Sequence, residues 1–189
     1  LVVDLIEGLG DGYEHKVVTS LLPSPPAYRD VDVTEFRAPQ SPEDVLPFLR
    51  DYAPSIVHVH YWGDCDFWWY DIFFRAAQTL GCPVIQNVNT PVEPYRADFV
   101  TRYVYVSRYV QSTFGDGGAR DTIIYPGIDF SLFSRRGEGK LPSDCIGMVY
   151  RLEGDKLNER SIDAFVRIVQ RRPQTTVIIV GGGTFLEPY

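Results

Sequence analysis

The chain has 189 residues, which is enough for one domain or for one domain and part of another. Its formal net charge of -7 argues against a protein that grips nucleic acid backbones, because that contact needs a basic face. No apolar run approaches the roughly 20 residues that span a bilayer, and the first residues carry acids without a basic leader. Neither a transmembrane segment nor a signal peptide is therefore expected.

The first half of the chain alternates predicted helices and strands. Residues 1–9 predict an amphipathic helix, because their apolar positions share one face, and residues 15–23 predict a short strand. The proline-rich segment 23–30 cannot continue a β-ladder. Further along, the sequence predicts a helix over 41–54 that opens with a capping serine, a strand over 55–62, a helix over 67–81 that ends at glycine, and a strand over 82–88.

The second half continues the alternation. Residues 102–115 predict a strand that passes into a helix capped by Ser107, and residues 121–128 predict a strand that stops at a Pro-Gly pair. Residues 135–144 mix charge, glycine and proline, which is typical of a linker. Beyond this linker the sequence predicts a strand over 145–152, a helix over 158–172 and a strand over 175–183.

Strands that alternate with helices indicate an α/β fold with parallel sheets. We expect a Rossmann-like domain over 1–134 that lacks its first strand, the linker over 135–144, and the first βαβ unit of a second Rossmann-like domain over 145–189. Both ends of the chain fall within regular patterns, so we expect a portion of a longer protein. The three cysteines are odd in number and far apart, which favours free thiols and a cytoplasmic location.

The stretch VHVHYWGDCDFWWYDIFF, residues 57–74, concentrates polar and aromatic side chains. His58 and His60 are two positions apart on a predicted strand, so they share one face of the sheet. Two histidines could bind zinc, but no further ligand cluster completes a site, and partly buried polar residues are the favoured interpretation. A third interpretation places His60, near the carboxyl end of the strand, in a ligand crevice.

A second candidate site lies in YRLEGDK, residues 150–156. Arg151 follows a predicted strand and Lys156 precedes a predicted helix, a pattern that suits a diphosphate. Taken alone, solvated charges paired with Glu153 and Asp155 are the favoured interpretation. The glycines at 181–183 indicate a tight turn or a close approach to a ligand, without identifying that ligand.

Five motifs in order resemble the retaining glycosyltransferases of family four, which have the GT-B fold and include sucrose-phosphate synthases and enzymes of mycothiol and capsule synthesis. The matching segments are VHVHYW, YVYVSRYVQSTF, IIYPGIDFSLF, IGMVYRLEGDKLNERSIDAF and TVIIVGGG. The resemblance covers almost the whole chain. It implies a hexosyltransferase-like enzyme that moves a sugar from a nucleotide-diphosphate donor to a hydroxyl acceptor with retention.

The resemblance also implies roles for four residues. Arg151 and Lys156 would hold the donor diphosphate without a required metal or other cofactor, and His60 would line the acceptor side of the cleft. Asn89 stands where the family has a histidine that reaches the transferred sugar, and an amide can still hydrogen-bond a sugar hydroxyl. Tyr150 replaces a glycine of the family beside the phosphates.

Two alternative functions stay open, and the kind of acceptor is open as well. A catalytically silent relative could act as a binding or scaffold subunit, a reading that Asn89 and Tyr150 motivate. A nucleotide-sugar epimerase of the same fold is a further option. The acceptor could be a sugar, a small molecule or a lipid-linked compound, and in the last case exposed aromatic residues would bring the protein to the membrane periphery.

Overall fold

The computed structural model describes residues 2–22, 31–128, 130–131, 142–153, 156, 159–184 and 187. The chain divides into two compact units, residues 1–128 and residues 129–189. The predicted linker lies mostly outside the described residues, which resume at residue 142. Each unit is considered by itself.

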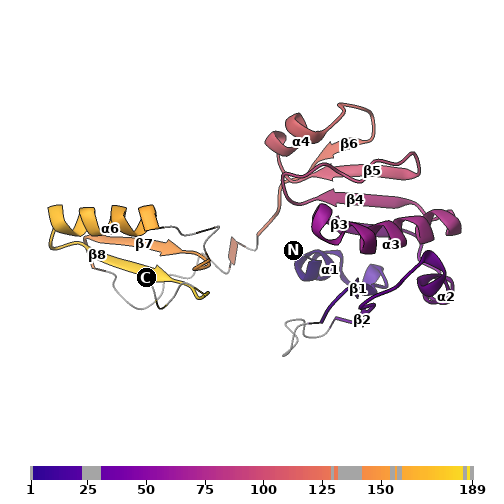
Figure 1. The fold of residues 1–189 in the computed structure, drawn as a ribbon, viewed down its shortest axis with the longest axis horizontal. Helices are drawn as coiled ribbons and strands as arrows, with labels where there is room; N and C mark the ends of the chain where they lie inside the picture. The colour runs from indigo at the N-terminus through magenta and orange to yellow at the C-terminus, as the bar shows by residue number, and fades with distance from the viewer. Residues whose placement is uncertain are drawn as a thin grey trace. The chain divides into compact units, whose positions relative to one another are not determined.

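The first unit contains two parallel sheets (Figure 1). The smaller sheet pairs β1 (Val17–Thr19) with β2 (Val33–Glu35). The larger sheet has four parallel strands in sequence order, namely β3 (Val57–Tyr61), β4 (Val84–Val88), β5 (Val100–Tyr105) and β6 (Asp121–Ile123). The chain is therefore α/β, and its four-stranded parallel sheet is compatible with a Rossmann-like fold.

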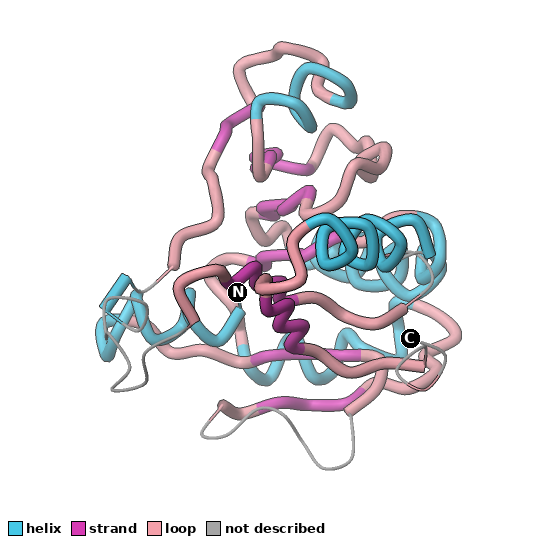
Figure 2. Tube along the Cα trace, turned by 90° about the vertical axis from the view of Figure 1, so that its left-hand side faces the viewer, coloured by secondary structure: helices cyan, strands magenta, loops and turns pink. Residues whose placement is uncertain are grey.

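Four helices accompany these sheets: α1 (Val2–Leu9), α2 (Pro42–Tyr52), α3 (Phe67–Leu80) and α4 (Arg108–Phe114). Figure 2 shows the strands of the four-stranded sheet one above another with helices beside them. Short 3₁₀ turns, η1 (Gly10–Gly12) and η2 (Asp64–Asp66), precede β1 and α3. Strand β2 was not predicted from the sequence, because it has only three residues and follows the proline-rich segment.

Local signals place the helix ends. At the start of α2 the Ser41 backbone N–H donates to the Asp44 carboxylate at 3.1 Å, and Pro42 occupies the first turn. Helix α3 ends at Gly81, which adopts a left-handed φ of 66°. The predicted cap of α4 is confirmed, since Ser107 Oγ accepts from the Val110 N–H at 3.2 Å.

Two hydrophobic clusters form the core of the first unit, and α3 contributes to both. In one, Phe74 and Ala77 of α3 pack with side chains of β3, β4 and β5. In the other, α3 packs with α2, and Val18 of β1 and Phe36, which follows β2, lie against the same cluster. The helix α3 thus covers the face of the larger sheet that carries Val59, Tyr61, Val84 and Val88.

The alternation along a strand leaves the other face of the larger sheet to a different set of residues. His58 and His60 of β3 lie on that face, beside Ile85 and Asn87 of β4. These residues are exposed or half-buried, whereas their neighbours Val59 and Tyr61 are buried. The face opposite α3 therefore carries the polar side chains of the first candidate site.

The second unit contains one β-α-β segment. Strand β7 (Cys145–Val149) pairs in parallel with β8 (Thr176–Val180), and α6 (Glu159–Arg171) connects them along the chain. The pairing continues past both strands, because the Tyr150 N–H donates to the Val180 oxygen and the Leu152 N–H to the Gly182 oxygen, each at 3.0 Å.

Two of the glycines after β8, Gly181 and Gly183, are required by this close pairing. A Cβ atom at Gly181 would lie 1.8 Å from the Tyr150 oxygen, and one at Gly183 would lie 2.3 Å from the Leu152 oxygen. Gly183 also has a φ of 156°, which other residues rarely adopt. Within the described residues, Gly181 and Gly183 therefore approach the backbone of the segment after β7, whereas the sequence suggested a tight turn or an approach to a ligand.

Candidate functional site at the ends of β3 and β4

Neighbouring strands bring the predicted residues His60 and Asn89 together. In the parallel ladder His60 is level with Asn87, and Asn89 follows β4 by one residue. The carboxyl ends of both strands lie at the same edge of the sheet, so two segments that are 29 residues apart meet there. The Asn89 side-chain Nδ2 lies 3.4 Å from His60 Nδ1.

Two more side chains extend this contact into a group of four, here called the His–Asn cluster: His58, His60, Asn87 and Asn89. The two imidazoles stack with their centroids 4.5 Å apart and their planes 29° from parallel. His58 Nε2 lies 3.4 Å from Asn87 Oδ1, and Asn87 Nδ2 donates to Asn89 Oδ1 at 3.1 Å. Each member of the cluster therefore contacts two others.

Both histidines of the cluster favour the neutral form. Burial, together with a smaller effect of the neighbouring His58, lowers the pKa of His60 to about 4. Burial also lowers the pKa of His58, while its hydrogen bond to Asn87 acts in the opposite direction. At neutral pH the cluster is uncharged and offers both donors and acceptors, which suits the hydroxyl groups of a neutral ligand.

The backbone beneath the cluster is held firmly. The Tyr70 hydroxyl of α3 donates to the His60 carbonyl oxygen at 3.1 Å. Gly63, with a φ of 95°, turns the chain away after β3, and a Cβ atom there would lie 3.0 Å from the Val92 side chain. Trp62, which directly precedes Gly63 in the chain, is 58% exposed.

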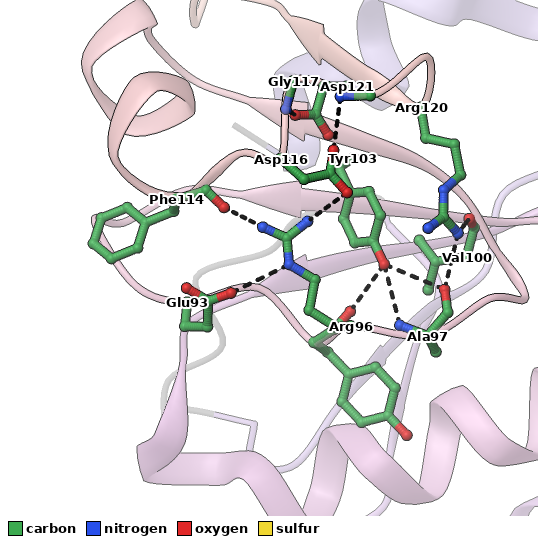
Figure 3. A network of polar contacts seen from close by, with 12 residues as sticks. Glu93, Arg96, Ala97, Val100, Tyr103, Phe114, Asp116, Gly117, Arg120 and Asp121 are labelled. Carbon is green, nitrogen blue, oxygen red and sulfur yellow. Dashed lines mark hydrogen bonds and ion pairs between the residues drawn. The ribbon is translucent and has the colours of Figure 1, made fainter.

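The loop that begins at Asn89 is anchored at its far end by the polar network in Figure 3. Arg96 and Arg120 lie on the Tyr103 ring, with guanidinium carbons 5.1 Å and 5.4 Å from its centroid. The Tyr103 hydroxyl accepts from the Ala97 N–H at 3.2 Å, and Arg120 donates to the Ala97 and Val100 oxygens.

Buried Gln86 anchors the same loop at its middle. When the side-chain amide is oriented so that its nitrogen and oxygen are both satisfied, Gln86 Nε2 donates to the Tyr95 oxygen at 2.9 Å and Oε1 accepts from the Tyr95 N–H at 3.0 Å. Gln86 lies on the α3 side of β4, opposite the cluster. The segment that follows Asn89 is thus held by Gln86 at Tyr95 and by the network around Tyr103 at Ala97.

The second candidate pair, Arg151 and Lys156, lies in the other unit, and both residues are exposed. Arg151 follows β7 directly, and the Lys156 N–H donates to the Glu153 oxygen at 2.9 Å in a turn before α6. The Glu153 carboxylate accepts from the Thr184 N–H at 3.2 Å and from its hydroxyl at 2.6 Å. Glu153 is therefore engaged by the segment after β8, and Asp155 lies outside the described residues.

Within the described residues, the acidic and thiol side chains that follow β3 do not gather into a metal site. Across the part of the chain that the structure describes, no group of three or more His, Cys, Asp or Glu side chains could hold a metal ion. Asp64 and Asp66 lie with Cys65 in the turn η2, and Cys65 is exposed. Among the described helices, none has the length and apolar content that a membrane span needs.

Sequence reasoning missed Asn87 as a member of the cluster. A signal was present, since Asn87 lies two positions before Asn89 and so shares its face of the predicted strand. The contact with His58 depends on the register between β3 and β4, which a single sequence does not reveal.

Comparisons with known proteins leave the family of the chain open. No protein-family model matches it, and no curated protein matches it. The function must therefore be argued from the motifs and from the geometry of the two candidate sites.

Proposed function

We propose that the chain belongs to a retaining glycosyltransferase of the GT-B type, which transfers a sugar from a nucleotide-diphosphate donor to a hydroxyl acceptor. The observation that carries this proposal is the contact between His60 and Asn89. The motif resemblance implied that His60 lines the acceptor side of the cleft and that Asn89 stands where a histidine reaches the transferred sugar, although the two residues are distant in sequence. Their juxtaposition at the carboxyl edge of a parallel sheet supports that role.

In the proposed enzyme the His–Asn cluster of the first unit binds sugar hydroxyls. Neutral imidazole and amide groups can both donate to and accept from hydroxyls without the cost of burying a charge. Arg151 and Lys156 bind the donor diphosphate, where a guanidinium grips two oxygens and an ammonium adds a compact charge. These cations stabilise the leaving diphosphate, so we expect transfer to proceed without an added metal.

A binding or scaffold subunit is the second candidate. It is favoured by one observation: the cluster holds neutral side chains whose polar groups are engaged with one another. Such a set can bind a sugar without reacting with it. An epimerase would use the same donor contacts and release an epimer without any acceptor.

A panel of nucleotide-diphosphate sugars distinguishes these functions. We expect one donor to raise the melting temperature and to yield a product whose anomeric configuration matches the donor, with EDTA present throughout. Ligand binding without turnover would support the scaffold, and an epimer formed without acceptor would support the epimerase. If no donor is bound, hydrolysed or transferred, the glycosyltransferase proposal is wrong.

A further inference from the structure

The contacts within the His–Asn cluster have a direction. Asn87 Oδ1 can only accept a hydrogen bond, so the facing Nε2 of His58 must carry a proton. The Asn87 amide nitrogen then donates to Asn89 Oδ1. Donors and acceptors thus alternate from His58 through Asn87 to Asn89.

The same direction fixes the proton on His60. The Asn89 amide nitrogen is a donor and lies 3.4 Å from His60 Nδ1, so this ring nitrogen must be the acceptor. A neutral imidazole carries one proton, which is therefore on Nε2. The nitrogen of His60 that is left for a ligand is a donor.

We propose that Asn87 is a positioning residue that, through Asn89, holds His60 in its Nε2–H tautomer, so that His60 donates to an oxygen lone pair of a neutral ligand. The tautomer follows from the orientation of the Asn87 and Asn89 amides. The identification of that oxygen as a sugar hydroxyl or ring oxygen rests on the proposed function.

This arrangement excludes His60 from the role of a general base. Its Nε2 already carries a proton, and its Nδ1 is occupied by Asn89. The lowered pKa of His60 is consistent with a neutral ring at physiological pH. The residue therefore selects ligands that present an acceptor oxygen and disfavours groups that can only donate, such as an ammonium.

The competing state reverses the direction of every hydrogen bond in the His–Asn cluster. If both amides were turned, His60 would donate from Nδ1 to Asn89, and its Nε2 would be bare. His60 would then be an acceptor and a possible base toward the ligand. The two states differ in the position of one proton, which nitrogen chemical shifts report directly.

The test is ¹⁵N NMR of the imidazoles at neutral pH without any sugar nucleotide. The chain has three histidines, so His→Gln variants assign their signals. We expect His60 and His58 both as Nε2–H tautomers. A His60 signal from the Nδ1–H tautomer in the unmodified protein would overturn the proposal.

Two substitutions at Asn87 test its positioning role. In Asn87→Asp the new carboxylate only accepts, so the Asn89 amide should turn its nitrogen toward residue 87 and its oxygen toward His60, which moves His60 to the Nδ1–H tautomer. In Asn87→Ala the constraint is removed, so a mixture is expected. Ile85→Val, on the same face of β4, is the control and should leave both histidine signals unchanged.

The outcomes separate this inference from the proposed function. If Asn87→Asp folds and His60 keeps its Nε2–H signal, Asn87 does not position the ring. The alanine variant decides the point if the aspartate variant fails to fold, and unchanged signals there overturn the proposal. The NMR spectra need no sugar nucleotide, so a failed transfer assay leaves the tautomer result valid. An unexpected tautomer of His60 likewise leaves the result of the transfer assay valid.

Discussion

At the scale of single residues, His60 couples folding to pH. Its pKa in the folded protein is about 4, whereas the ordinary value is 6.5. Between these values the unfolded chain binds a proton that the folded chain does not. The free energy of unfolding should therefore fall as the pH drops from about 6.5 to about 4.

Melting curves of the unmodified protein and of His60→Gln test this coupling. The unmodified protein should lose more melting temperature over this pH range than the variant, because glutamine does not titrate. For a chain of this length, each kcal/mol lost at the melting temperature corresponds to about 2–4 °C. Parallel curves for the two proteins would contradict the burial of a neutral His60.

A buried aromatic residue gives a second test at this scale. Phe74 is fully buried and stacks on Tyr95 with centroids 4.2 Å apart, so it links α3 to the loop that follows Asn89. Phe74→Ala should cost about 3–5 kcal/mol of unfolding free energy, measured by urea denaturation. Phe67→Ala is the control, since Phe67 is 46% exposed, and a similar loss in both variants would contradict this account of the core.

At the scale of elements, the cap of α4 contributes a measurable share of stability. Removing the Ser107 hydroxyl leaves the Val110 N–H without its partner, so Ser107→Ala should cost about 1 kcal/mol. Ser112 lies in the same helix and donates to the Tyr109 oxygen rather than capping. Ser112→Ala should cost less, and an equal cost would argue against a specific capping role.

The glycines after β8 give a matched pair in the second unit. Gly181→Ala places a methyl group against the Tyr150 oxygen and should cost about 1–3 kcal/mol, because the paired backbone must move. A Cβ atom at Gly182 meets nothing within 4 Å, so Gly182→Ala should be tolerated. Amide hydrogen exchange over β7 and β8 measures the loss of protection in each variant. Equal protection in Gly181→Ala and Gly182→Ala would contradict the close pairing.

Elements with strong local signals could be predicted from the sequence. Ser107 and Gly81 mark helix ends through their own side chain or backbone freedom, so they need no tertiary context. Strand β2 could not be predicted, because three residues after a proline-rich segment give no usable alternation. Its pairing with β1 is a tertiary interaction.

The candidate site was predicted in part. His60 and Asn89 followed from motif resemblance, whereas Asn87 and its direct contact with His58 required the register of two strands. The glycines at 181–183 suggested a tight turn or a close approach to a ligand, whereas the structure places the backbone of Tyr150 and Leu152 beside them. Long-range register and backbone contacts of this kind are not encoded in local patterns.

At the scale of the whole molecule, the proposed function assigns different tasks to the two units. The first unit carries a neutral cluster suited to sugar hydroxyls, and the second carries exposed cations suited to a diphosphate. The chain as a whole is acidic, with a formal net charge of -7, so general attraction of anions would not account for the proposed phosphate binding. The proposal therefore depends on particular residues.

Calorimetric titration with nucleoside diphosphates tests this central claim most directly. We predict that the protein binds at least one of them, and that Arg151→Ala and Lys156→Ala each weaken the affinity about tenfold, or ~1.4 kcal/mol. Arg167→Ala, which removes an exposed cation from α6, should leave the affinity unchanged. No binding by the unmodified protein, or equal affinity in all three variants, would contradict the proposed donor site.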